Sequence, residues 1–156
     1  MGAATVMVGA ISDTHGELPG MALALLGGST HILHAGDAGS MSVLAKLGGI
    51  AKVTAVRGNS EPSGRTRSLP WTAAIELGGA RLYLLHDLAD LDLDPAAAGF
   101  AAVVHGHTHR PEIVRRDGVL YVNPGSPVRP RGGFLPTIAR IVVFGGEVTA
   151  EIVPVG

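Results

Sequence analysis

Short apolar runs alternate with glycine-rich and polar stretches along the whole chain. Three short runs, 5–11, 31–35 and 52–56, predict buried strands, the first of them rich in β-branched residues. Between them, residues 18–26 and 40–47 carry Ala and Leu at helical spacing; Pro19 falls in the first expected turn, and Ser40 is an expected cap. The first third is therefore predicted as strand, helix, strand, helix, strand, which requires parallel strands with helices packed outside them.

Paired strands are predicted in the second half of the chain. Residues 72–77 and 81–86 flank Gly78-Gly79, residues 112–116 and 119–122 flank Asp117-Gly118, and residues 138–144 and 147–153 flank Gly145-Gly146. Each pair carries a short hairpin signal. A parallel first half followed by antiparallel hairpins predicts an α/β fold, with two mixed β-sheets stacked face to face and flanked by helices in an αββα sandwich.

Composition narrows the class of protein. The 156 residues fit a single domain spanning 1–156, and 46% apolar against 16% charged residues favours a compact globule over disorder. A net charge of −1 and 4% aromatic residues argue against a long nucleic acid as partner. No membrane span and no signal peptide are recognised, so a cytoplasmic protein is expected. The absence of cysteine leaves only His, Asp, Glu or Asn as ligands for a metal.

Three histidines stand within five residues, directly after the apolar pair Val103-Val104. The valines predict the end of a buried strand, and Gly106 is expected to let the backbone turn sharply there. His107 and His109 would then project from one short loop. Because neutral imidazole is the commonest protein ligand for transition metals, the loop predicts half of a metal site, with a solvated His-rich turn as the alternative.

Other polar residues follow the remaining predicted strands, namely Asp13, His15, Asp37, Asn59 and His86. In open parallel sheets, ligands gather at the carboxyl ends of the strands. Taken singly, the two aspartates suit turns or helix caps, Asn59 suits a Gly-Asn turn, and His86 suits a hydrogen-bonded core histidine. Taken together, those structural explanations require several coincidences at one end of one sheet. The other three histidines, His31, His34 and His105, are assigned to structural roles.

The order of these motifs carries a family resemblance. The chain reads Asp13-x-His15, Gly36-Asp37, Gly58-Asn59, His86, Gly106-His107-x-His109 and Asn123-Pro124-Gly125-Ser126. In this it resembles the calcineurin-like metallophosphoesterases, and most closely their small single-domain bacterial and archaeal phosphodiesterases. Any one motif is weak, but the first five of these, in this order on strand ends, are specific.

The resemblance implies two divalent metal ions. One would be held by Asp13, His15, Asp37 and His109; the other by Asn59, His86 and His107, with Asp37 as the shared bridge. A bridging carboxylate suits two cations about 3.5–4 Å apart, because it offsets their repulsion. Oxygen and nitrogen ligands without sulfur favour manganese first, with iron, nickel or zinc as alternatives. Asp37, Asn59 and His107 are the residues expected to take part in catalysis.

The implied reaction is hydrolysis of a small phosphodiester by attack of a metal-bridging hydroxide on phosphorus. Two cations, two carboxylates and a hydroxide leave a charge of roughly +1, which complements a singly charged diester. Five arginines near the site loops are candidates for phosphate contacts, with solvated surface charges as the alternative: Arg57, Arg65, Arg67, Arg129 and Arg131.

The chain also departs from the family pattern. Gly58-Asn59 is followed by Ser60-Glu61, where the family usually has His or Cys and then Asp. Ser60 cannot protonate a leaving group as His would, so slow turnover of esters with poor leaving groups is expected. Asp87 has two open roles, as an acceptor that orients His86 or as a solvated carboxylate.

An interaction module is the alternative function. The same fold is used by a retromer subunit that works through its surfaces, and the missing histidine favours a weakly active or inactive metal-binding module. The complete ligand set favours catalysis instead, because a scaffold has no need for seven converging polar residues. Apolar hairpin edges leave a homo-oligomer open as a further expectation.

Overall fold

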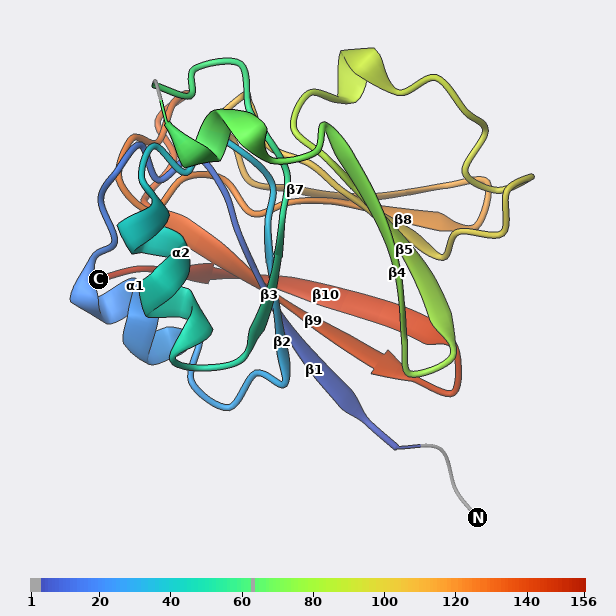
Figure 1. Ribbon diagram of the computed structural model, residues 1–156. Coiled ribbons are helices and arrows are strands. Elements are labelled where there is room, and N and C mark those ends of the chain that lie inside the picture. The colour runs from blue at the N-terminus through green and yellow to red at the C-terminus, as the bar shows by residue number, and fades with distance from the viewer. Residues whose placement is uncertain (1–3, 63) are drawn as a thin grey trace.

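The computed structural model describes residues 4–62 and 64–156 and contains two five-stranded sheets (Figure 1). The first sheet has the order β10-β9-β1-β2-β3. It comprises β1 (Val6–Ile11), β2 (His31–His34), β3 (Lys52–Ala55), β9 (Thr137–Phe144) and β10 (Glu147–Pro154). The first three strands are parallel, and the last two form a hairpin that adds antiparallel to β1.

The second sheet has the order β4-β5-β6-β8-β7. Its strands are β4 (Thr72–Leu77), β5 (Ala80–Leu85), β6 (Ala102–Val104), β7 (Glu112–Arg116) and β8 (Val119–Asn123). Strands β5, β6 and β8 are parallel, and β4 and β7 join antiparallel at the two edges. The prediction of two stacked, mixed sheets is therefore confirmed, and all three predicted hairpins are present.

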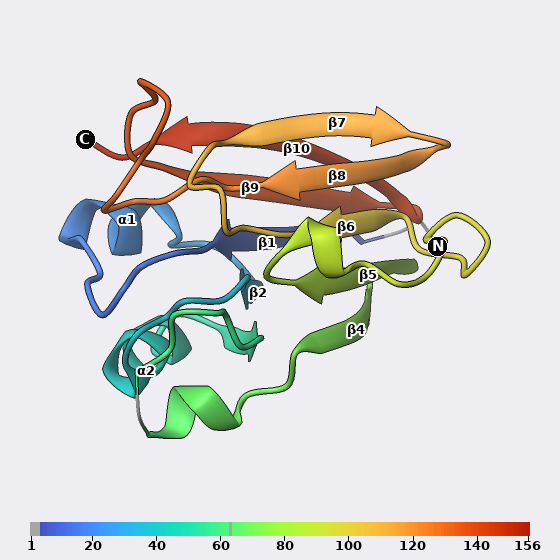
Figure 2. The same cartoon turned by 90° about the horizontal axis from the view of Figure 1, so that it is seen from above.

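Alternation along the strands builds three apolar layers. Val8, Leu33, Ile141, Leu84 and Val122 are among the residues buried between the sheets. Neighbouring positions in the first sheet, such as Ile11, Ile32 and Ile138, face the helices instead. Those helices are α1 (Gly20–Leu25) and α2 (Met41–Gly48), and Figure 2 shows both at the first sheet.

Helix α2 begins and ends as its sequence predicts. The Ser40 side chain accepts a hydrogen bond from the Ser42 amide at 3.0 Å, which caps the first turn. Val43, Leu44 and Leu47 bury the apolar face, at roughly 1.5–3 kcal/mol each. Helix α1 is shorter than predicted, since Pro19 is its N-cap residue and no side chain caps it.

The layer that covers the second sheet differs from the helices that the sequence predicts there. Its outer face, which includes Tyr83 and Val103, is covered by Phe100 and by the leucines of the segment between β5 and β6. That segment holds only the short 3-10 helix η2 (Leu88–Asp90); a second one, η1 (Arg65–Ser68), precedes β4. Its apolar residues lack a helical period, which is why the sequence does not reveal this layer.

The three hairpin turns lie at one end of the sandwich, and the loops after the parallel strands lie at the other. Two of the turns touch, since the Gly146 amide donates to the Gly78 carbonyl at 3.2 Å. Among the described residues, no helix has the length and apolar character needed to cross a membrane.

Candidate metal centre

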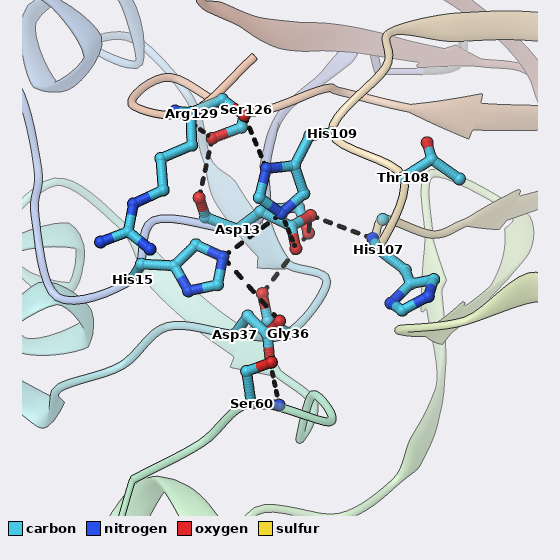
Figure 3. Close-up of polar contacts among 12 residues, drawn as sticks. Asp13, His15, Gly36, Asp37, Ser60, His107, Thr108, His109, Ser126 and Arg129 are labelled. Carbon is cyan, nitrogen blue, oxygen red and sulfur yellow. Dashed lines mark hydrogen bonds and ion pairs between the residues drawn. The ribbon is translucent and has the colours of Figure 1, made fainter. Parts of the chain in front are cut away.

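The seven predicted ligands all lie at the loop end of the sandwich. Asp13 and His15 follow β1, Asp37 follows β2, Asn59 follows β3, His86 follows β5, and His107 and His109 follow β6. The two sheets meet here, because the His107 amide donates to Asp13 Oδ2 at 3.0 Å across them. Figure 3 shows the side chains of His15 and His109 directed toward Asp13 and Asp37.

Backbone conformation marks the same residues. Asp13, His15, Asp37, His107 and His109 all have left-handed φ values, between 47° and 75°. Such values are uncommon outside glycine and cost free energy. Each turns the chain abruptly after a strand, and in all of them except His107 the side chain is directed toward the centre.

Glycines beside the ligands provide space. A Cβ on Gly58 would collide with Asp37 Oδ1, and one on Gly106 would collide with Ser12 Oγ and approach Asp13 Oδ2. The sequence analysis assigns Gly106 to a sharp turn, but this residue is not among the positive-φ glycines. Glycine is required at position 106 because two chain segments pass too closely there for any side chain.

Asp13 has one satisfied oxygen and one free oxygen. Its Oδ2 accepts hydrogen bonds from Ser12 Oγ at 2.7 Å and from the His107 amide. Its Oδ1 is buried and receives no hydrogen bond from the described residues. That atom faces His109 Nε2 at 3.3 Å and His86 Nε2 at 3.8 Å. A buried carboxylate oxygen without a donor is suited to bind a cation.

Asp37 is held in the same manner. Its Oδ1 accepts a hydrogen bond from the Ser60 amide at 2.8 Å. Its Oδ2 lies 3.3 Å from His86 Nε2 and 3.9 Å from His15 Nε2, so one oxygen faces imidazoles on two sides. This position suits the bridging role that the sequence predicts for Asp37.

Backbone acceptors orient two of the imidazoles. His86 Nδ1 lies 2.7 Å from the Ala35 carbonyl, and His109 Nδ1 lies 2.6 Å from the Arg129 carbonyl. A carbonyl only accepts, so each Nδ1 carries the proton and each Nε2 keeps its lone pair for the centre.

Two groups of ligand atoms result. Asp13, His15 and His109 form one, and Asp13, Asp37 and His86 form the other; in each group the ligand atoms lie within 4.8 Å of one another. His15 Nε2 and His109 Nε2 are only 3.3 Å apart. The groups adjoin and have Asp13 in common, whereas the sequence singles out Asp37 as the shared residue.

Asn59 and His107 lie toward the rim. Asn59 Oδ1 is 3.0 Å from His86 Nε2 and 3.1 Å from His107 Nδ1. His107 is 40% exposed, and its Nε2 lies 3.6 Å from Asp87 Oδ2. It does not enter either ligand group. Asp87 faces His107 and does not orient His86, which is bonded to Ala35.

Electrostatics couple the carboxylates to the imidazoles. Burial alone would raise the pKa of Asp13, but His109 and His86 outweigh it and keep that pKa below its usual value. The pKa of Asp37 is likewise lowered despite burial, chiefly through His86. The pKa of His86 is raised by Asp37 and Asp13 against burial, and that of His109 by Asp13. A cation entering this centre must displace those imidazole protons, so its affinity falls at low pH.

Glu61 supports the centre in a way the sequence analysis misses. Its Oε2 accepts hydrogen bonds from the Asp37 amide at 3.0 Å and the Gly58 amide at 2.9 Å. Its Oε1 accepts one from the Gly39 amide at 3.1 Å. One carboxylate thereby ties the loop after β2 to the loop after β3. The acidic residue that follows Gly58-Asn59 is the one feature of the sequence that could have pointed to this role.

The motif from Asn123 to Ser126 braces the histidine loop. Asn123 Nδ2 donates to the Gly106 carbonyl at 3.2 Å and to Thr108 Oγ1 at 3.0 Å. Ser126 Oγ donates to the Asp13 carbonyl at 2.8 Å. These bonds are buried, so the motif supports the ligands from behind.

The other histidines lie outside the ligand groups. His34 is fully buried; its Nδ1 accepts from the Gly36 amide at 3.2 Å, so its Nε2 donates to Thr14 Oγ1 at 3.0 Å. Burial lowers the pKa of His34 to about 4, which keeps the ring neutral. His31 Nε2 pairs with Thr54 Oγ1 at 2.9 Å. Burial also lowers the pKa of His105 to about 4.

Comparison with known proteins agrees with this fold and site. A family model described as a calcineurin-like phosphoesterase superfamily domain matches residues 6–144. A probable metallophosphoesterase of Methanocaldococcus jannaschii is 30% identical, over 97% of this chain and 82% of the relative. Phosphodiesterase YfcE of Escherichia coli K12 is 32% identical, over 78% of this chain and 79% of YfcE.

A solved structure shares the fold at lower identity. Wild-type Vps29 of Entamoeba histolytica, in complex with Zn²⁺, has a TM-score of 0.72 and 20% identity, over 97% of this chain and all of that one. The sequence matches define the class of protein as a phosphoesterase. More particularly, the chain belongs to the calcineurin-like phosphoesterase superfamily.

Proposed function

We propose that this protein is a phosphodiesterase that depends on two divalent metal ions and hydrolyses small phosphodiesters. The observation that carries the proposal is the pair of adjoining ligand groups, in which Asp13 Oδ1 is buried without a hydrogen-bond donor. A donor set of carboxylates and neutral imidazoles suits manganese first, and also iron, nickel or zinc.

The two positions would share the aspartates. Asp13, His15 and His109 would hold one cation and His86 the other, with Asp37 between them. Asn59 lies 3.0 Å from His86 Nε2 and is a further candidate ligand of the second. His107 lies at the rim, so it can be a ligand only if its ring moves. In its present position it is better placed to contact the substrate.

Divalent cations at such a site lower the pKa of bound water and polarise phosphoryl oxygens. The protein holds the ligands rigidly, since His86 and His109 are fixed through Nδ1 and Asp37 through the Ser60 amide. Arg129, whose side chain extends beside His15, can meet a phosphate oxygen at the edge of the centre (Figure 3). Asn59 and His107 line the opposite side of the opening.

A metal-binding interaction module is the second candidate. The similarity in fold to Vps29 and the serine at position 60 support it. The two candidates differ in one measurable property, since only the enzyme turns over a diester when metal is supplied.

The test is hydrolysis of bis(p-nitrophenyl) phosphate by protein stripped with chelator and reconstituted with Mn²⁺. We expect activity that requires the metal and is lost in Asp37→Asn. Asp117→Asn is the matched control, because Asp117 also has a left-handed backbone (φ 50°) but lies in a hairpin turn. Equal activity in both variants, or none in the native protein, would refute the enzymatic proposal.

A further inference from the structure

A cavity of about 420 Å³ opens beside the metal centre. Asn59 and His86 line it on the side of the centre, so the cavity is continuous with the proposed reaction site. Its other walls include Trp71, Asp87, Asp90 and Asp92. This volume falls in the range that small-molecule sites occupy.

One wall of the cavity is acidic. Asp87 faces His107 and caps η2 through the Ala89 amide at 3.0 Å, which fixes its carboxylate. Asp90 and Asp92 follow within the same segment and are exposed. Lysine and arginine are absent from the described residues that line the cavity. Along this wall the three carboxylates therefore disfavour a group that carries a second negative charge.

Trp71 provides an aromatic surface at the same cavity. Its side chain is 56% exposed, although large apolar side chains are usually covered. The Arg57 guanidinium lies 4.3 Å from the ring centroid and holds the ring from one face. An aromatic ring beside carboxylates is the combination that recognises organic cations, above all ammonium groups.

We infer that the cavity binds an ester group carrying a positive charge, an amino alcohol or quaternary ammonium alcohol, so that the substrates are zwitterionic phosphodiesters. The inference rests on the proposed function, because it concerns one of the two ester arms of the same substrate. In hydrolysis, water forms one P–O bond, the P–O bond to the leaving alcohol breaks, and the alcohol takes up a proton.

The test compares two esters that differ in one atom. Choline p-nitrophenyl phosphate carries a quaternary nitrogen, which is carbon in 3,3-dimethylbutyl p-nitrophenyl phosphate. Both release nitrophenolate, so their ratio of kcat/KM isolates the charge. We expect kcat/KM to be about tenfold higher for the choline ester, because an aromatic face and partly exposed carboxylates each stabilise a cation modestly.

Variants test which carboxylates cause the preference for the choline ester. In the double variant Asp90→Asn, Asp92→Asn we expect the ratio to fall toward one. Asp94→Asn is the matched control, since Asp94 is exposed in the same segment but does not line the cavity. A ratio near one in the native protein, or one that the double variant leaves unchanged, would overturn the inference while leaving the phosphodiesterase proposal intact. Preference for a thymidine p-nitrophenyl ester over the choline ester would also overturn it.

A binding measurement separates the two proposals. Trp71 is the only tryptophan of the chain, so its fluorescence reports occupancy of the cavity. If neither ester is hydrolysed but the choline ester alone quenches Trp71, the cavity binds cations and the phosphodiesterase proposal fails. If neither ester is hydrolysed nor changes the fluorescence, both proposals fail.

Discussion

The two ends of the sandwich differ in the residues that adopt left-handed backbone conformations. At both ends, the chain reverses or leaves a strand at residues with a left-handed backbone conformation. In the hairpin turns glycine takes most of these conformations, at Gly78, Gly79, Gly118, Gly145 and Gly146. At the metal centre aspartate and histidine take them as well as glycine, and among described residues other than glycine only Asp117 does so elsewhere.

The difference shows which end is built for stability and which for chemistry. Left-handed backbone in residues other than glycine costs on the order of 1 kcal/mol or more each. The loop end bears that cost at five positions and also buries two carboxylates. Hydrogen bonds that Ser12 and Ser60 donate to the carboxylates, and one that Glu61 accepts from the Asp37 amide, offset part of it, and a cation would offset more.

The comparison between the two ends is tested most strongly by adding one methyl group at each end. Gly58→Ala forces a Cβ into Asp37, so we expect a loss of activity of over about 100-fold and weakened metal binding. Gly118→Ala meets open space and carries only backbone strain, which we expect to lower the free energy of unfolding by about 1 kcal/mol without loss of activity.

Diester hydrolysis, metal titration and urea unfolding of the two glycine variants give the answer. The contrast between the ends would be wrong if Gly58→Ala kept full activity.

A smaller effect is expected when Glu61 is changed. Glu61→Gln replaces a carboxylate that accepts three amide hydrogen bonds with an amide that has only one acceptor oxygen. We expect metal affinity to fall about 10-fold, the lower part of the range for residues that position ligands. Glu147→Gln, beside the exposed turn of the β9–β10 hairpin, is the control. Isothermal titration with Mn²⁺ measures both, and equal affinities would remove Glu61 from a positioning role.

Acidification should also act mainly at the loop end. The pKa of His34 is about 4 when folded and about 6.5 when unfolded, so folding favours the neutral ring. Its contribution is complete above pH 6.5 and is lost as pH falls toward 4, because the unfolded chain takes up the proton first. The shift corresponds to about 3 kcal/mol.

His31, at the opposite end of the same strand, is the natural comparison for His34. In chelator, we expect His34→Asn to flatten the decline of unfolding free energy between pH 6.5 and 4 more than His31→Asn does. Urea unfolding across that range measures it, and identical slopes in the two variants would contradict the assignment.

A tenfold effect is also expected when the side chain of residue 60 is changed. Ser60→His places an acid near the opening, so we expect hydrolysis of alkyl diesters with poor leaving groups to rise about tenfold. Bis(p-nitrophenyl) phosphate serves as the internal control, because nitrophenolate leaves without a proton. An unchanged or lower rate on the alkyl esters would count against a missing acid.

Strand positions and hairpins were predictable because their signals are local. The period of two in residues 72–77 and the Asp117-Gly118 turn each lie within a few adjacent residues. Asp13, Asp37 and His109 were predicted as ligands from motif order and their places after strands. The cover of the second sheet was not, because the leucines and Phe100 that form it have no regular spacing.

Contacts between distant segments set the limit of the sequence analysis. Glu61 accepts hydrogen bonds from the Asp37 and Gly39 amides, which lie more than 20 positions away, so the sequence shows the acidic residue but not its partners. The two roles left open for Asp87 were to orient its neighbour His86 or to be solvated, yet it faces His107. In both cases tertiary packing decides the partner.

The support of Asp37 by the Ser60 amide, not by the Ser60 side chain, has an evolutionary consequence. Every residue except proline offers that N–H, so mutation can exchange the functional group at this position without dismantling the scaffold around it. Related chains can thus diverge in reactivity at a single codon while inheriting the same architecture.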